Sequence, residues 1–279
     1  MTKLLPANVG PILINETNLS RAWAKIFLHL ADHSGHQVTP LILSLTGFDE
    51  DGTPQEDNEI KTILDKLLAA KLPKQRSIED VAYTIFPQRM WKIAAYDRTK
   101  LYSLYKQVFP RYQAMNRKVN NRGLYFQRLI DYGRGPEEGN QLEWIISRYN
   151  RRNGVRRSML QASVFDPGKD HVATGQLQFP CLQQVSFEPT KQGLVINAFY
   201  ATQQILIKGY GNYLGLVHLG AFMAKEMKMK LARMNVTVGI AKFKGEDLSE
   251  NQNELAELIA AARKCIVEHN KEDQEAEPK

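Results

Sequence analysis

Cys181 is placed where a cysteine could act as a nucleophile. It ends the tripeptide Phe-Pro-Cys, and the pair Arg156-Arg157 precedes it by about one predicted strand and one loop. A thiolate is a strong nucleophile, and nearby arginines lower the pKa of a thiol and can hold an anionic substrate. The alternative is that a single cysteine after proline packs as a small apolar residue. Cys265, in a predicted helix, has no such setting, and we assign it no role.

The positive charge of the chain is concentrated in its middle. Residues 111–157 hold eleven basic residues, ten of them arginine, and four acidic ones, an excess that equals the net charge of +7. Arginine favours planar, bidentate contacts to phosphate or carboxylate. A solvated basic face and a phosphate-binding site both explain the pattern. Aromatic residues interleave with the arginines, which would suit single-stranded nucleic acid, although their helical spacing also fits burial in a core.

Composition and motifs exclude several classes of protein. Two cysteines in 279 residues are too few for a disulfide-built scaffold, and no apolar run approaches the ~18 residues of a membrane span. Because the first residues lack an apolar signal region, we expect a soluble, cytoplasmic protein. The sequence has no GxxxxGKS/T phosphate loop and no HExxH or CxxC spacing, and its six histidines form no ligand set, so we expect no metal.

Strands and helices are mixed along the chain without strict alternation. Apolar spacing predicts helices over residues 19–30, 60–68, 77–87, 96–108, 142–149, 212–234 and 255–266. It predicts strands over residues 12–14, 38–48, 158–165, 182–187, 194–201 and 236–243. Because no stretch rich in proline or serine divides the chain, we predict an α+β fold with a single domain over residues 18–268. A short N-terminal segment (1–17) and an acidic flexible tail (269–279) would flank it.

The order of these features resembles the thymidylate synthase superfamily. In that family an Arg-Arg pair precedes a Pro-Cys-His nucleophile segment and a β-hairpin, and a turn with Gly and Asn then enters a buried helix. The matching pieces here are VRRSMLQASVFDPG, LQFPCLQQVSF, GLVINAFYATQQ and KGYGNYLGLVHLGAFMA. Upstream, residues 123–128 resemble the family's segment with a Gly, a Tyr and a terminal Arg, and residues 77–83 take the place of the helix with its catalytic Glu.

The resemblance implies a fold, a reaction and a set of site residues. The fold would be a large mixed β-sheet packed against helices. Cys181 would add to C6 of a pyrimidine nucleotide, so that a methyl or hydroxymethyl group from 5,10-methylenetetrahydrofolate is transferred to C5. Asp80 would organise proton transfer, and Tyr125 would line the pocket beside the thiol. The residues implied to bind the nucleotide and its phosphate are Arg156, Arg157, Arg128, Asn212 and Gln203, with the Arg156-Arg157 pair reaching the partner's site across a homodimer interface.

Several positions depart from the family pattern. Leu182 follows the nucleophile in place of His. Thr202 and Gln203 replace an Arg-Ser pair, and Ile205 replaces an Asp. The strand that begins near Val236 lacks the Asp-x-His-x-Tyr motif that binds the sugar. Three hypotheses follow: a divergent transferase, a subunit that has lost turnover and senses a nucleotide or binds a protein, and an arginine-rich nucleic-acid-binding protein.

Overall fold

A seven-stranded mixed β-sheet organises the part of the chain that the computed structural model describes, namely residues 10–33, 35–71, 74–151, 155–173, 180–243 and 250–275. Phe179 and residues 276–279 of the predicted tail lie outside these ranges. The strands are β1 (Ile12–Glu16), β2 (Gln37–Val38), β3 (Leu41–Leu45), β4 (Gln161–Ser163), β5 (Leu182–Thr190), β6 (Gly193–Gln204) and β7 (Leu231–Lys242). Their order across the sheet is β1-β3-β7-β6-β5-β4, with β2 paired to β7.

Both parallel and antiparallel pairs occur in this sheet. β1 is parallel to β3 and β6 is parallel to β7, whereas β3 with β7, β5 with β6 and β4 with β5 are antiparallel. The predicted α+β class with a large mixed sheet is therefore confirmed.

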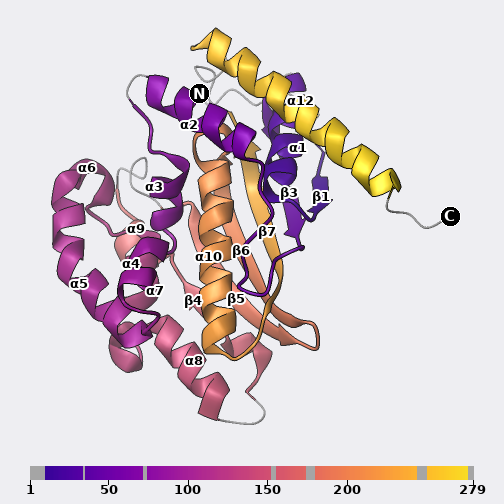
Figure 1. Ribbon diagram of the computed structural model, residues 1–279. Helices are drawn as coiled ribbons and strands as arrows, with labels where there is room; N and C mark the ends of the chain where they lie inside the picture. Colours follow the sequence, from indigo (N-terminus) through magenta and orange to yellow (C-terminus); the bar gives the residue numbers. More distant parts are fainter. Residues whose placement is uncertain are drawn as a thin grey trace.

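Helices lie over one face of the sheet and beside it (Figure 1). They are α1 (Leu19–Asp32), α2 (Asn58–Ala70), α3 (Ile78–Tyr83), α4 (Gln88–Ile93), α5 (Arg98–Met115), α6 (Arg117–Asn120), α7 (Tyr125–Ile130), α8 (Gln141–Arg151), α9 (Pro167–Asp170), α10 (Tyr210–Glu226) and α12 (Gln252–Glu275). Short 3-10 turns, η1 (Glu137–Gly139) and η2 (Arg157–Met159), and a π-helical turn, η3 (Ile205–Gly209), complete the elements.

Helix α10 is the buried centre of the fold. It runs across the sheet in Figure 1 and contacts β6, β7 and α3. Two glycines let α3 approach closely: a Cβ added at Gly211 would lie 2.6 Å from Cβ of Val81, and one added at Gly215 would lie 2.7 Å from the carbonyl oxygen of Ala82. Larger side chains there would push α3 away. The glycines therefore fix the position of α3, whose C-terminal end reaches the pocket described below.

The face of the sheet away from α10 carries an exposed apolar row. The strand register places Leu13, Ile42, Thr237 and Phe199 side by side across β1, β3, β7 and β6. Leu13 is 68% exposed, Phe199 44% and Ile42 37%. The residues that alternate with them along the strands are buried or nearly so, because successive side chains of a strand point to opposite faces. This exposed row is of the kind that marks an interaction surface.

Long-range pairing moves several predicted boundaries. The helix predicted over residues 212–234 ends at Glu226, because the chain from Leu231 onward pairs with β3 on one side and β6 on the other. The continuous strand predicted over 38–48 divides into β2 and β3 around Pro40, which has no backbone N–H to donate. Helix α12 continues to Glu275, within the segment predicted as a flexible tail.

The helix predicted to close at Pro110 instead runs on to Met115. Beyond the proline, the ring of Tyr112 packs at 5.2 Å from that of Tyr83, and Nδ2 of Asn120 donates a hydrogen bond of 2.8 Å to the carbonyl oxygen of Tyr112. Tertiary contacts therefore stabilise the last turn against the loss of one helical hydrogen bond.

Candidate active site

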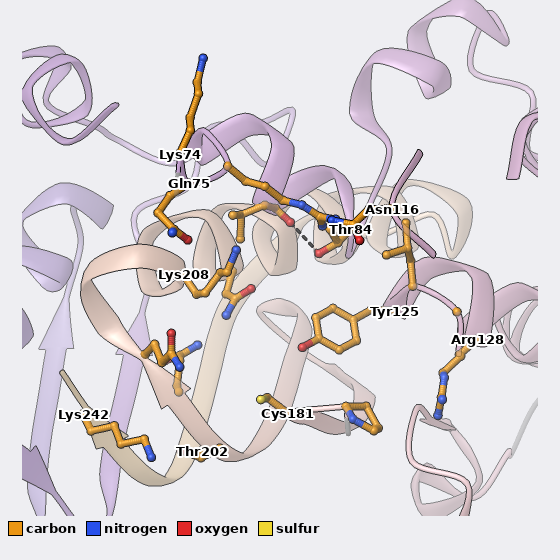
Figure 2. Close-up of a pocket in the computed structure, with 18 residues that line it drawn as sticks. Lys74, Gln75, Thr84, Asn116, Tyr125, Arg128, Cys181, Thr202, Lys208 and Lys242 are labelled. Carbon is orange, nitrogen blue, oxygen red and sulfur yellow. Dashed lines mark hydrogen bonds between the residues drawn. The ribbon is translucent and has the colours of Figure 1, made fainter. Parts of the chain in front are cut away.

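A pocket of about 590 Å³ opens at the carboxyl ends of β6 and β7, beside α3, α7 and the start of α10 (Figure 2). This volume is typical of sites that bind small molecules. The lining residues come from segments far apart in the sequence: 74–84, 116–128, 180–181, 202–212 and Lys242. The fold thus gathers at one place the segments that carry the predicted nucleophile and most of its predicted neighbours.

Cys181 lines this pocket directly before β5. Its carbonyl oxygen accepts a hydrogen bond of 3.0 Å from the backbone N–H of Ala201, which holds it against the end of β6. The side chain is half-buried. Burial raises the pKa of the thiol, and the positive charges of Lys242 and Lys208 act in the opposite direction. The thiol therefore faces the pocket within the field of two cations.

Tyr125 begins α7, and its hydroxyl points toward Cys181 (Figure 2). Burial raises the pKa of this phenol, as does the nearby Cys181, and the backbone amides of Leu182 and Cys181 act to lower it. A phenol with a raised pKa stays protonated at neutral pH and can donate a hydrogen bond. Tyr125 thus lies beside the thiol, where the resemblance places it.

Gln203 presents a buried amide to the pocket. Its side chain is 2% exposed, and its Oε1 accepts a hydrogen bond of 2.8 Å from the hydroxyl of Tyr213. Within the described residues, Nε2 of Gln203 and Oγ1 of neighbouring Thr202 have no hydrogen-bond partner. An unsatisfied buried polar group costs about 1–3 kcal/mol, so these two unpaired atoms are a local cost of building this wall of the pocket. Asn212, at 5% exposure, adds a second amide to the lining.

The pocket is positively charged. Its cationic residues, apart from Arg128, are Lys74, Arg76, Lys208 and Lys242. Among the residues that the structure describes, no aspartate or glutamate lines it. A concave site lined by one sign of charge attracts the opposite charge, because its low-dielectric walls focus the field. The arrangement therefore suits an anionic small molecule.

Comparison with solved structures identifies the fold. The chain matches a thermostable thymidylate synthase A from Bacillus subtilis with a TM-score of 0.50 and 10% sequence identity, covering 85% of this chain and 84% of that one. The chain has a thymidylate synthase-like fold.

The likeness in sequence covers a shorter stretch. Over 105 residues the chain is 30% identical to a "Putative thymidylate synthase" of Methanocaldococcus jannaschii. This stretch is 37% of the chain and 46% of that protein, so the match spans less than half the length of the relative. No family model matches the chain.

Within this thymidylate synthase-like fold, Arg128 has a structural role. Its five N–H donors are all engaged: Nε and Nη2 donate to the carbonyl oxygen of Arg122, Nη1 to that of Val164, and Nη1 and Nη2 to the carboxylate of Asp170 at 2.6 and 2.7 Å. Burial alone would raise the pKa of Asp170, but hydrogen bonds from Arg128 and the Asp166 amide outweigh it and lower that pKa. Arg128 also lines the pocket, but its N–H donors are occupied by these protein acceptors.

Asp80 lies outside the pocket. Its side chain is exposed on α3, and its backbone N–H donates a hydrogen bond of 3.1 Å to Oγ of Ser77, which caps the helix. Val81 and Thr84, which are buried, line the pocket instead. The thymidylate synthase-like fold therefore brings α3 to the expected place without pointing the expected carboxylate into the site.

Arg156 and Arg157 are also outside the pocket. Both are exposed, and Nη1 of Arg157 donates a hydrogen bond of 2.9 Å to Oε1 of Glu188 on β5. The resemblance assigns this pair to a partner subunit's site. Within a single chain the pocket contains Cys181, Tyr125 and the side-chain amides of Gln203 and Asn212. It contains neither Arg156 nor Arg157.

Sequence reasoning missed Lys208 and Lys242. Lys208 stands in the segment KGYGN, and Lys242 ends the strand that replaces the family's sugar-binding motif. Each follows a short apolar run, Ile205–Ile207 for Lys208 and Ile240–Ala241 for Lys242, and this is a weak signal. Only the pairing of β6 with β7, which sets Gln204 opposite Lys242, brings them to the same end of the sheet as Cys181.

The described residues also bear on the other expectations from sequence. They contain no group of three or more His, Cys, Asp or Glu placed to hold a metal, and none of their helices is long and apolar enough to cross a membrane. The aromatic residues among the arginines point inward: Phe126 is buried, and Tyr112, Tyr125, Tyr132, Trp144 and Tyr149 are half-buried. They pack in the protein rather than offer exposed rings on which bases could stack.

Proposed function

We propose that this chain is a divergent thymidylate synthase-like transferase that attaches a one-carbon unit to C5 of a pyrimidine nucleotide through a covalent adduct of Cys181. The observation that carries the proposal is the position of the Cys181 thiol in a cationic pocket with buried, unpaired polar groups. The fold and the name of the Methanocaldococcus jannaschii relative support the same reaction class.

The chemistry begins at the thiol. The thiolate sulfur of Cys181 bonds to C6 of the ring, and the electron pair of the C5–C6 double bond moves through C4 to O4, which leaves C5 nucleophilic. The positive pocket stabilises the charge that develops on the ring, and the amide of Asn212 can donate a hydrogen bond to a ring carbonyl. Once the one-carbon unit has bonded to C5, water accepts the C5 proton, the C5–C6 double bond re-forms, and the C6–S bond breaks with its electron pair returning to the thiolate of Cys181.

Residues at the rim fit a reduced folate, the one-carbon donor that the resemblance implies. Lys74 is exposed and Arg76 half-buried in the lining of the pocket, and their charges complement the carboxylates of a glutamate tail. When bound there, 5,10-methylenetetrahydrofolate would supply the one-carbon unit.

A trapping experiment tests the proposal. The full chain is incubated with 5-fluoro-2′-deoxyuridine monophosphate and 5,10-methylenetetrahydrofolate and then weighed intact. We expect a mass increase that maps to Cys181, is abolished in Cys181→Ala and persists in the matched control Cys265→Ala. An unshifted mass with this nucleotide and with the other common 5-fluoropyrimidine nucleotides would refute the transferase.

One observation favours a second function, a subunit that binds a nucleotide without turnover. Burial raises the pKa of Cys181, and no described residue offers the pocket a carboxylate for proton transfer. This function predicts nucleotide binding without a mass shift. It also predicts that Cys181→Ala leaves the affinity for the nucleotide unchanged.

We further propose that the chain forms a homodimer through the exposed row of Leu13, Ile42, Thr237 and Phe199. Three of these four side chains are apolar and more than a third exposed, and the row crosses four strands of one continuous sheet face. A second copy offers the same row, so a two-fold interface would bury both.

A further inference from the structure

The turn that leads from β6 into α10 is a π-helical turn, and it forms part of the pocket wall. η3 covers Ile205–Gly209, directly after β6 and directly before Tyr210, the first residue of α10. Lys208 of this turn and Asn212 of the first turn of α10 line the pocket. Single π-turns are rare and are often found at functional sites. The contacts that hold this turn therefore bear on the shape of the site.

Two side chains of α1 bond to the two ends of the turn. Ser20 and Trp23 are three residues apart, so they share one face of α1, and both are fully buried. Nε1 of Trp23 donates a hydrogen bond of 3.2 Å to the carbonyl oxygen of Ile205, the first residue of η3. The hydroxyl of Ser20 lies 2.7 Å from that of Tyr210, the residue that follows the turn. Ile205 and Tyr210 are five residues apart, which is the span of one π-helical hydrogen bond.

The contact between Ser20 and Tyr210 belongs to a chain of hydrogen bonds. The backbone N–H of Asp57 donates to Oγ of Ser20 at 2.7 Å, and the hydroxyl of Tyr210 donates to Oε1 of Glu56 at 2.9 Å. Because Tyr210 has one proton and the Glu56 carboxylate accepts it, the bond between the two hydroxyls runs from Ser20 to Tyr210. Burial raises the pKa of Tyr210, as does Glu56, so the phenol keeps this proton. The chain ties the start of α10 to α1 and to the loop before α2.

The conformation of the turn decides where its polar side chain lies. β6 is paired with β7 as far as Gln204, and Gly211 and Gly215 pack α10 closely against α3, so a change of conformation would fall on the turn between them. An α-helical turn over the same residues would rotate the part before α10 by about 100° about the helix axis, which is the rotation of one residue. Lys208 would then leave the pocket wall.

We propose that Ser20, Trp23 and Tyr210 are positioning residues for the pocket. They hold η3 and the first turn of α10 in the conformation that places Lys208 and Asn212 in its wall. None of the three positioning residues lines the pocket, so they act through the backbone of the turn. That this wall contacts a nucleotide rests on the proposed function, whereas the anchoring of the turn rests on the hydrogen bonds alone.

Amide hydrogen exchange on the full chain tests the anchoring without a ligand. Trp23→Phe removes the indole N–H and Tyr210→Phe removes the hydroxyl, and an aromatic ring remains in both. The matched controls are Trp91→Phe and Tyr102→Phe, which change buried rings outside the pocket lining. The hydroxyl of Tyr102 has no hydrogen-bond partner in the part of the chain that the structure describes, so the control removes no such bond there.

The expected change is local. Peptides that cover residues 205–213 should exchange at least about fivefold faster in Trp23→Phe and in Tyr210→Phe, because each variant leaves a buried polar group without its partner. Peptides from β7 should keep the wild-type rate, and the two controls should leave residues 205–213 within about twofold of the wild type. An unchanged rate in either variant, or an equal rise in the controls or across the whole chain, overturns the proposal.

A second measurement separates positioning from a general loss of stability. The rate of adduct formation at Cys181 with 5,10-methylenetetrahydrofolate is followed against the concentration of 5-fluoro-2′-deoxyuridine monophosphate. In Trp23→Phe and Tyr210→Phe the half-saturating concentration should rise at least about threefold. The maximal rate should stay within about twofold, because Cys181 is held at the start of β5 by its hydrogen bond from Ala201. A lower maximal rate with an unchanged half-saturating concentration would indicate partly unfolded protein and overturns the proposal.

The two proposals can fail separately. Absence of an adduct in the wild type refutes the transferase, and amide exchange, which needs no ligand, still decides the anchoring. An adduct whose half-saturating concentration is the same in the wild type and in both variants refutes the positioning and leaves the transferase standing.

Discussion

Asp170→Asn should destabilise the fold far more than an ordinary loss of an ion pair. The carboxylate is fully buried, and it accepts from Arg128 at 2.6 and 2.7 Å. The substitution keeps the size of the side chain but leaves the guanidinium charge buried and opposes it with an amide N–H. Removing one partner of a buried pair costs about 3–5 kcal/mol. Because one carbonyl-type acceptor remains, we expect about 3 kcal/mol.

The exposed pair of Arg157 and Glu188 supplies the matched control. It has a similar contact of 2.9 Å, but its side chains are 69% and 43% exposed. Glu188→Gln should therefore cost less than about 0.5 kcal/mol. Thermal unfolding followed by circular dichroism should show Asp170→Asn melting about 6–10 °C below the wild type and Glu188→Gln almost unchanged.

Two results would refute this reasoning. A loss below about 1 kcal/mol in Asp170→Asn would mean that the guanidinium is solvated rather than enclosed. Equal losses in the two variants would mean that burial does not decide the strength of these pairs. A second arm replaces both partners, as in Arg128→Met/Asp170→Leu, and should recover most of the stability because no buried charge remains.

Two other properties of the fold lead to measurable effects. Phe199→Glu places a charge in the exposed row of the sheet and should convert a dimer to a monomer in analytical ultracentrifugation. The control Met115→Glu, at a site 79% exposed on α5, should leave the dimer intact. A monomeric wild type would contradict the proposed interface. Burial lowers the pKa of His218 from its ordinary value of 6.5 to about 4, so the neutral ring stabilises the fold above pH 6.5 and that stability is lost as the pH falls toward 4. Between pH 7 and 5 the loss should be about 2 kcal/mol. In His218→Gln the melting temperature should fall less over this interval, and an unchanged pH dependence would contradict the burial of a neutral ring.

Local signals predicted much of the fold. Asn18 caps α1 through a hydrogen bond of 3.1 Å to the backbone N–H of Arg21, and Ser77 caps α3, as their positions before apolar helical spacing indicate. The end of α10 was not predictable in this way, because residues 227–234 have the Leu, Ala and Met content of a helix. Their state is decided by β3 and β6, which are distant in the sequence and pair with β7 on both sides.

The site likewise has residues that local motifs predict and contacts that depend on distant parts of the chain. The order of motifs around Cys181 was enough to select Tyr125, Gln203 and Asn212, which share its pocket. It could not show how the donors of Arg128 are used, because no local pattern indicates that Asp170, 42 residues later, engages the guanidinium. A motif reports which residues a fold usually brings together, whereas the use of each polar atom depends on all its neighbours.

The charge balance of the pocket favours one half of the proposed reaction. Forming the adduct requires a thiolate and then places negative charge on the ring, and Lys208 and Lys242 stabilise both anionic states. Releasing the adduct requires that the C5 proton be removed, and no described residue of the lining offers a carboxylate for that step. The described lining therefore supplies cations for both steps but no carboxylate to remove the C5 proton, and this slows release once a group has been attached at C5. In the presence of 5,10-methylenetetrahydrofolate, a nucleotide adduct should accordingly accumulate on Cys181 to a level that intact mass spectrometry detects, even with a substrate that carries hydrogen at C5.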